Sequence, residues 1–142
     1  DIICGFPGES ESDFKDTLDL VEKVRYESAF MYYYSPRPGT EAAKIADQLS
    51  EEEKKDRLAR LIEVQNRISL EESSQLIGRE FEVLVESTAA RDQNDLVGKT
   101  RSGRSVNFPG NTSLIGSYMR VRIEQARNWT LSWRLLSPTP ED

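Results

Sequence analysis

The chain has 142 residues, enough for one domain or for two small ones. Hydrophobic residues make up 37% of it and charged residues 31%, which excludes collagen-like and wholly disordered chains. No apolar run approaches the roughly 18 residues that a membrane-spanning helix needs. The sequence contains one cysteine, Cys4, and no histidine, so it can form no disulfide framework, no four-cysteine zinc site and no Ser-His-Asp triad.

The net charge of −6 is unevenly distributed along the chain. Residues 1–72 carry 10 Lys and Arg against 17 Asp and Glu, whereas residues 73–142 carry 9 against 8. Residues 99–134 contain seven basic side chains, six of them arginine, and one acid. Arginine suits planar, bidentate contacts with phosphate, so this stretch is compatible with RNA binding. A solvated β-surface that is merely basic explains it equally well.

The first part of the chain predicts a strand, a helix and a second strand. An apolar run over 1–4 is followed by a turn rich in glycine and by Ser10, which can cap a helix over 10–24. An aromatic-rich strand is expected over 29–34. Strand, helix and strand with short connections indicate a parallel pair. Because Asp1 opens directly on the apolar run, without a leader sequence, we expect the chain to be the C-terminal part of a longer protein.

A loop and a long helix follow. Two prolines and a glycine make 35–40 a loop. Ser50 and Glu53 form a capping box for a helix that extends to about residue 75, and Gly78 lies just past its end. This helix is the expected connector between two structural parts.

From Arg79 onward the hydrophobic period changes to two, which indicates β-strands. Ser102 and Gly103 predict a hairpin turn. Five short strands are expected, at 79–86, 96–100, 104–108, 118–126 and 129–135. This number of strands in so short a segment is typical of a small antiparallel β-barrel, OB-like in size.

Several segments resemble the radical S-adenosylmethionine (SAM) methylthiotransferases. The sequence of Asp1–Glu9 resembles the fifth strand of their barrel, and Tyr34–Ala43 resembles the loop after the sixth. Glu53–Gln65 is similar to their linker helix. The remainder resembles a TRAM domain, a small RNA-binding barrel, chiefly at Gly98–Arg101 and Val106–Phe108.

The resemblance implies an α/β plus all-β architecture. We expect the C-terminal fragment of a partial (β/α) radical SAM barrel, followed by a small antiparallel β-barrel, the OB-like TRAM domain. The expected parts are the radical SAM portion at 1–49, a linker helix at 50–76, the TRAM RNA-binding barrel at 77–138 and a tail at 139–142. Two parallel strands cannot shield their own faces and edges, so the first part requires neighbours from elsewhere.

The resemblance also implies a reaction and its cofactors. The branch that the chain resembles adds a methylthio group to C2 of isopentenylated (dimethylallyl) adenosine next to the tRNA anticodon, with SAM and two [4Fe-4S] clusters as cofactors. The family's three-cysteine cluster motif is not in this sequence. We therefore expect the parent to be the enzyme and this polypeptide alone to be inactive, with Cys4 a small buried hydrophobe.

No catalytic residue and no metal ligand is assigned to this chain. The carboxyl ends of barrel strands are where active sites lie, and the resemblance implies cofactor binding there, at Ile3, Gly5, Tyr34 and Ser35. Cationic and aromatic side chains are the candidates for RNA binding: Arg37, Lys99, Arg101, Arg104, Phe108, Arg120, Arg122 and Trp129. A tight strand-to-helix turn would explain Gly5 without a ligand, and an ordinary surface position would explain Arg37.

The expected partner is the tRNA anticodon stem-loop, with no membrane contact, and the expected parent is a cytoplasmic monomer. Two alternatives stay open. One is a non-catalytic RNA-binding module in which the first 75 residues are a scaffold. The other is a methylthiotransferase that acts on threonylcarbamoyl-adenosine in tRNA or on a ribosomal protein.

Overall fold

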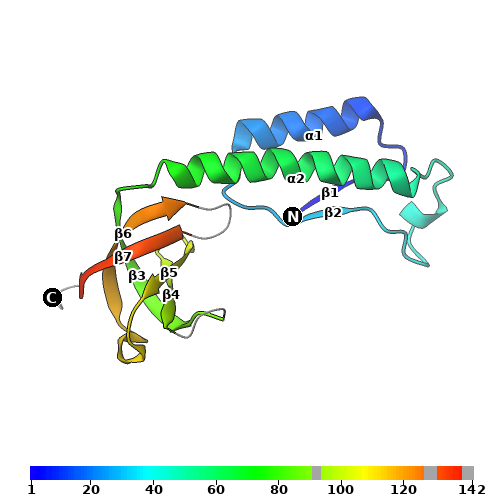
Figure 1. Cartoon of the computed structure of the whole chain (residues 1–142). Coiled ribbons are helices and arrows are strands. Elements are labelled where there is room, and N and C mark those ends of the chain that lie inside the picture. The colour runs from blue at the N-terminus through cyan, green and yellow to red at the C-terminus, as the bar shows by residue number, and fades with distance from the viewer. Residues whose placement is uncertain (91–93, 127–130, 139–142) are drawn as a thin grey trace. The chain divides into compact units, whose positions relative to one another are not determined.

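The computed structural model describes residues 1–90, 94–126 and 131–138, the last of these by their backbone alone, and the chain divides into two compact units, Asp1–Ser69 and Leu70–Asp142 (Figure 1). Among these described residues, no helix is both long enough and apolar enough to span a membrane.

The first unit holds two strands and two helices. In chain order its elements are β1 (Ile2–Cys4), α1 (Glu11–Val24), β2 (Met31–Tyr33), the short 3-10 helix η1 (Ala42–Lys44) and α2 (Glu51–Ser74), which extends beyond the end of the unit. Both expected capping boxes are present. Ser10 and Asp13 exchange hydrogen bonds at the start of α1, and Ser50 and Glu53 do so at the start of α2.

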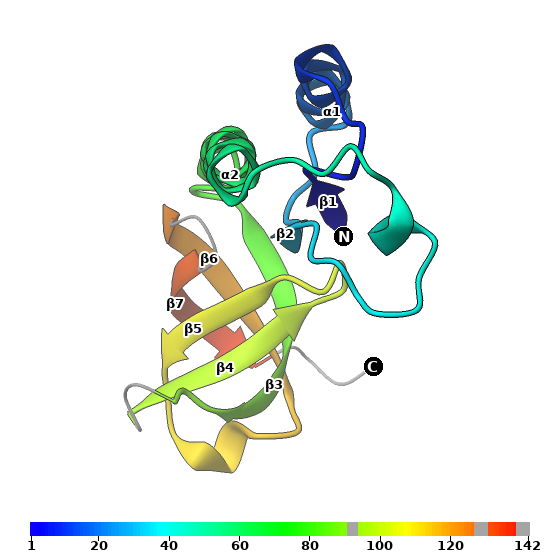
Figure 2. The ribbon, with the colours of Figure 1, turned by 90° about the vertical axis from the view of Figure 1, so that its right-hand side faces the viewer.

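Strands β1 and β2 pair in parallel, and the two helices cover one face of the pair (Figure 2). Ion pairs from Arg60 to Glu11 and from Arg67 to Glu22 show that α1 and α2 run in the same direction. The core beneath them consists of Cys4, Phe14, Val21, Leu61 and Ile68. One parallel pair does not make a barrel, so the partial (β/α) barrel stays a prediction.

The second unit is a closed β-barrel. Its elements are β3 (Glu80–Thr88), β4 (Asp95–Thr100), β5 (Ser105–Pro109), the 3-10 helix η2 (Thr112–Leu114), β6 (Tyr118–Ala126) and β7 (Leu131–Pro138). The strands close in the order β3-β4-β5-β7-β6. The expected antiparallel, OB-like barrel is present, with one parallel seam between β5 and β7. Five strands cannot alternate direction around a closed ring, because the number is odd, so at least one seam must be parallel.

The alternation of the barrel strands separates an apolar interior from a charged exterior. Met119, Val121 and Ile123 of β6 are buried, and the residues between them are exposed. Inward side chains of β3, β4 and β5 complete the core: Val83, Val85, Leu96, Val106 and Phe108. The inside and outside positions that period-two alternation predicts along β6 are confirmed.

Gly98 of β4 occupies a position that no side chain can share. A Cβ atom there would lie 2.8 Å from the carbonyl oxygen of Leu84 and 3.3 Å from the ring of Phe108. We expect Gly98→Ala to lower the free energy of unfolding of the barrel by about 1–3 kcal/mol, because the backbone must shift to make room. Denaturant titration monitored by tryptophan fluorescence would measure this, since both tryptophans of the sequence lie after residue 128. Ser105→Ala, on the exposed side of β5, is the control, and equal effects of the two would contradict the argument.

Candidate functional site

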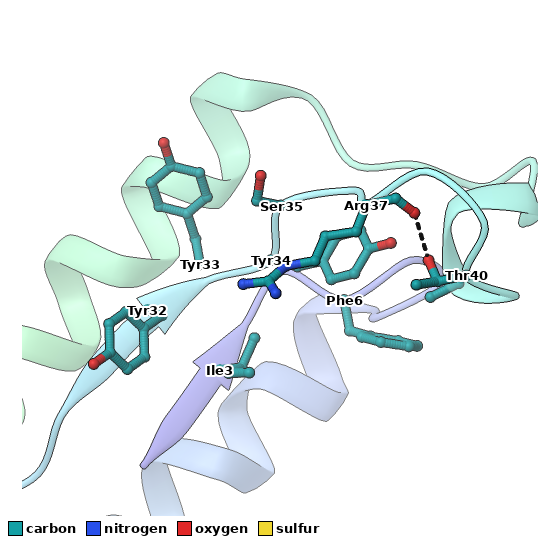
Figure 3. A pocket seen from close by; sticks show the side chains of 9 residues that line it. Ile3, Phe6, Tyr32, Tyr33, Tyr34, Ser35, Arg37 and Thr40 are labelled. Carbon is teal, nitrogen blue, oxygen red and sulfur yellow. Dashed lines mark hydrogen bonds between the residues drawn. The ribbon is translucent and has the colours of Figure 1, made fainter.

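The face of the β1–β2 pair opposite the helices is open. Ile3 and Tyr32 lie opposite each other in the strand register, and their side chains are 58% and 51% exposed. A pocket of about 550 Å³ occupies this region at the carboxyl ends of the strands (Figure 3). Its lining consists of Ile3, Phe6, Tyr32, Tyr33, Tyr34, Ser35, Arg37, Thr40 and Ala42.

Aromatic rings form much of the pocket wall. The rings of Phe6 and Tyr34 pack edge to face, with their centroids 5.2 Å apart and their planes at 67°. The Tyr34 hydroxyl is buried and has no hydrogen-bond partner among the described residues. Tyr33 instead turns its ring toward α2, where the ammonium of Lys54 lies 5.7 Å from the ring centroid (Figure 3). The pocket is therefore mostly apolar, with few polar groups.

A buried ion pair holds the turn that carries Phe6. Both carboxylate oxygens of Glu9 accept the Gly5 N–H at 3.0 Å. Arg57 of α2 donates to the Glu9 carboxylate at 2.6 Å and to the Glu9 carbonyl at 2.8 Å. The side chains of Arg57 and Glu9 are only 8% and 12% exposed. The turn is thus fixed by an ion pair between residues 48 positions apart in the sequence. No local sequence pattern predicted this pair.

Gly5 belongs to this turn and is not part of the pocket lining. Its φ is +70°, and a Cβ atom would lie 2.7 Å from Cγ of Lys54. Glycine is needed here for the left-handed backbone and for the packing of α2. Of the four residues expected to bind a cofactor, Ile3, Tyr34 and Ser35 line the pocket together. Gly5 does not line it, and the backbone conformation and the packing of α2 explain why this residue is glycine.

Arg37 lines the same pocket, although the sequence suggested an RNA contact for it. Its carbonyl accepts hydrogen bonds from the Thr40 hydroxyl at 2.8 Å and the Thr40 N–H at 3.3 Å, which closes the loop between the flanking prolines. Within the described part of the chain its guanidinium forms no ion pair. No acidic residue lines the pocket, so Arg37 gives it a net positive charge.

Cys4 is buried in the core on the helix side of β1, as expected. Its thiol donates a weak hydrogen bond to the Tyr32 carbonyl at 3.5 Å. Burial, and to a lesser extent the Glu9 carboxylate, raises the pKa of this thiol. The thiolate form that binds metals is therefore disfavoured. Among the residues that the structure describes, no three His, Cys, Asp or Glu side chains are grouped as a metal site would require.

Three arginines of the barrel lie beside glutamates of β3. In the antiparallel register of β3 and β6, Glu80 lies opposite Arg122 and Glu82 opposite Arg120. Arg122 forms an ion pair with Glu80 at 2.5 Å, and Arg101 forms one with Glu82 at 3.3 Å. The cationic surface expected from β6 alone is therefore partly neutralised by β3.

Of the two aromatic candidates for RNA stacking, one is buried and the other is not described by the structure. Phe108 is fully buried in the barrel core, because its position on β5 points inward, so its ring is not available to a base. Trp129 lies outside the described residues. Tyr118 of β6, which we did not select from the sequence, is 54% exposed on the outer face. The same alternation that placed Arg120 and Arg122 outside could have identified it.

The remaining candidates lie on or near the β4–β5 hairpin. Lys99 is exposed on β4, opposite Ser105 of β5 and Leu84 of β3. Arg104 is partly buried beside the hairpin turn, where its N–H donates to the Thr100 hydroxyl at 3.1 Å. Lys99 and Arg104 therefore flank the same hairpin turn, with Arg104 one residue before the register partner of Lys99.

A small closed barrel with one parallel seam is an architecture common among nucleic-acid-binding modules. Residues 74–135, which make up most of the second unit, match the TRAM domain family.

The chain as a whole is similar to particular tRNA-modifying enzymes. It is 49% identical to the tRNA-2-methylthio-N(6)-dimethylallyladenosine synthase of Moorella thermoacetica, over 96% of this chain and 31% of that protein. The protein of the same name from Thermoanaerobacter sp. strain X514 is 49% identical over 96% of the chain and 29% of its own length. The one from Acetivibrio thermocellus is 50% identical over 92% of the chain and 27% of its own length. These matches confirm the resemblance to the methylthiotransferases, with the chain corresponding to the C-terminal part of proteins more than three times as long.

Proposed function

We propose that this chain is the C-terminal part of a radical SAM enzyme that adds a methylthio group to C2 of isopentenylated adenosine next to the anticodon of tRNA. The observation that carries the proposal is the 49% identity over 96% of the chain to synthases named for that product. The similarity extends through both units and is not confined to the TRAM domain, which matches residues 74–135. A role as an RNA-binding module alone would not account for the open pocket of the first unit.

The pocket fits part of SAM. Its volume of about 550 Å³ lies in the range of small-molecule sites, and its apolar wall suits a purine ring. Ile3, Phe6 and Tyr34 would contact the adenine, and Ser35 would offer a hydroxyl nearby. When bound, SAM supplies the methyl group and the radical chemistry of this family. The residues of this chain would form one wall of that site and exclude water from it.

The two [4Fe-4S] clusters do not fit the described residues. Clusters are held by several cysteine thiolates, and this sequence offers one buried cysteine whose pKa is raised. The cluster ligands of the parent would therefore come from residues other than these, and we assign no cluster contact to this chain.

The open sheet face supports a place within a larger barrel. In a (β/α) barrel the helices cover the outside and the inward faces of the strands meet in the interior. The helices of the first unit cover one face of β1–β2, while Ile3, Tyr32 and the Phe6 turn are left on the other. We infer that residues 1–49 are the last strands of such a barrel, residues 50–76 the linker helix and residues 77–138 the TRAM barrel, with 139–142 outside the described residues.

The TRAM barrel would bind the anticodon stem-loop through its outer cations, with Lys99, Arg101 and Arg120 as the leading contacts. Arg101 and Arg122 would exchange partly exposed glutamate partners for phosphate, which costs little because surface ion pairs contribute under about 1 kcal/mol. Since tRNA is the substrate, the parent would act in the cytoplasm.

Nucleoside mass spectrometry of tRNA tests the proposed reaction. In cells that lack the parent gene, we expect the methylthiolated isopentenyladenosine to disappear and isopentenyladenosine to accumulate, and a plasmid copy of the gene should reverse both changes. Loss of the methylthio group from threonylcarbamoyl-adenosine instead would assign the protein to that branch of the family. Unchanged tRNA nucleosides would refute the proposal.

A further inference from the structure

The outer face of the TRAM barrel carries one exposed aromatic ring among its described residues, that of Tyr118. Tyr118 is the first residue of β6, and it lies opposite Leu84 of β3 in the antiparallel register. Leu84 in turn lies opposite Lys99 of β4. Cross-strand neighbours have Cβ atoms about 5 Å apart, so Tyr118, Leu84 and Lys99 form one continuous row across three strands.

Cations flank this row on two sides. Arg120 follows Tyr118 on the same face of β6, about 7 Å along the strand. Arg101 follows Lys99 beyond the end of β4 and contacts Glu82, which lies between Arg101 and Arg120. Lys99 and Arg120 form no ion pair among the described residues.

The acidic side chains of β3 define where a polyanion cannot lie. Glu82 and Glu86 are on either side of Leu84 along β3, and Glu80 lies further from it. A phosphate backbone would be repelled from that strand and attracted to the strands on either side, at Lys99 and at Arg120. The apolar side chains of Tyr118 and Leu84, which lie between these two cations, remain available to a base.

We propose that Tyr118 is a stacking platform for one unpaired base of an RNA loop, with Lys99 and Arg120 holding the phosphates on either side. Proteins that bind single-stranded nucleic acid combine aromatic rings, on which bases stack, with cations that contact the phosphates. Tyr118, Leu84, Lys99 and Arg120 provide this combination, and any base can stack because every base has an aromatic face. Paired bases are not accessible to such stacking, so the site selects unpaired nucleotides. This inference rests on the proposed binding of tRNA, and it adds which residues contact the loop and how.

The test compares two RNAs against the purified full chain: a stem-loop with an anticodon-arm sequence, and the same stem as a fully paired duplex. We expect Tyr118→Ala to weaken binding of the stem-loop about tenfold or more, with the duplex affected less than about twofold. Tyr118→Phe keeps the ring and should bind like the unaltered chain. Equal losses on both RNAs, or no loss on either, would overturn the stacking role.

Charge variants separate the phosphate contacts from the stacking. Lys99→Ala with Arg120→Ala should weaken both RNAs and reduce the slope of log affinity against log salt by about 0.7 per lost contact on single strands. Lys15→Ala removes the same type of charge from the exposed face of α1 and is the control. A wild-type chain that binds RNA while the Tyr118 and Lys99/Arg120 variants match it would refute this inference and the contacts assigned to Lys99 and Arg120, and would leave tRNA binding itself standing. A wild-type chain that binds neither RNA would refute both the inference and the proposed tRNA binding.

Discussion

Replacement of Arg57 by alanine is expected to lower the free energy of unfolding of the first unit by about 3 kcal/mol. The substitution leaves the buried Glu9 carboxylate without its charged partner and also removes the donor to the Glu9 carbonyl. The cost of an uncompensated buried charge exceeds that of a lost surface ion pair several-fold. Far-UV circular dichroism during urea titration would measure the effect, because α1 and the greater part of α2 lie in this unit.

Arg60→Ala is the matched control, since Arg60 lies one helical turn further along α2 and its partners Glu11 and Asp56 are exposed. We expect this change to cost about 1 kcal/mol or less. A double variant, Glu9→Gln with Arg57→Met, removes both charges and should recover much of the stability that Arg57→Ala loses. Equal costs for Arg57→Ala and Arg60→Ala would show that the Glu9 pair is not desolvated as the structure indicates.

Local patterns in the sequence predicted most elements of the fold. The Ser10–Asp13 and Ser50–Glu53 boxes identified where α1 and α2 begin, because capping involves residues three positions apart. The alternation from Tyr118 onward separated core from surface along β6 in the same way. Such signals depend on backbone geometry within one element, and a single sequence contains them in full.

Contacts between elements could not be obtained this way. The burial of Phe108 depends on which face of β5 closes against the other strands, and the expectation of an exposed ring failed for that reason. The pairing of Glu80 with Arg122 depends on the register between β3 and β6, which are separated by two other strands in the chain. Likewise, the position of Arg37 in the same pocket as Ile3 arises from the parallel pairing of β1 and β2.

Arg37 leads to a second large expected effect, now on activity. As the one charged residue in the pocket lining, without an ion-pair partner among the described residues, it is available to an anionic ligand, which the proposed function identifies as SAM or tRNA. Hydrogen bonds to a charged group contribute about 1.5–3 kcal/mol, so the proposed function predicts that Arg37→Ala in the intact parent reduces kcat/KM for tRNA about tenfold to a hundredfold. Figure 3 shows its side chain extending from the loop back over the sheet toward Ile3, which supports a contact inside the pocket.

Separate binding measurements on the Arg37→Ala enzyme identify which molecule carries the anion. A weaker affinity for SAM with unchanged tRNA affinity indicates the carboxylate of the cofactor, whereas weaker tRNA binding with a smaller salt slope indicates a phosphate. Arg37→Lys retains the charge without the bidentate geometry, so its affinity for the anionic ligand should lie between the affinities of the unaltered and the Arg37→Ala proteins. Lys44→Ala, on the neighbouring η1 and outside the pocket lining, should leave both affinities unchanged. If Arg37→Ala and Lys44→Ala behave alike, Arg37 is a surface arginine, and the anionic group must be bound by residues outside the pocket.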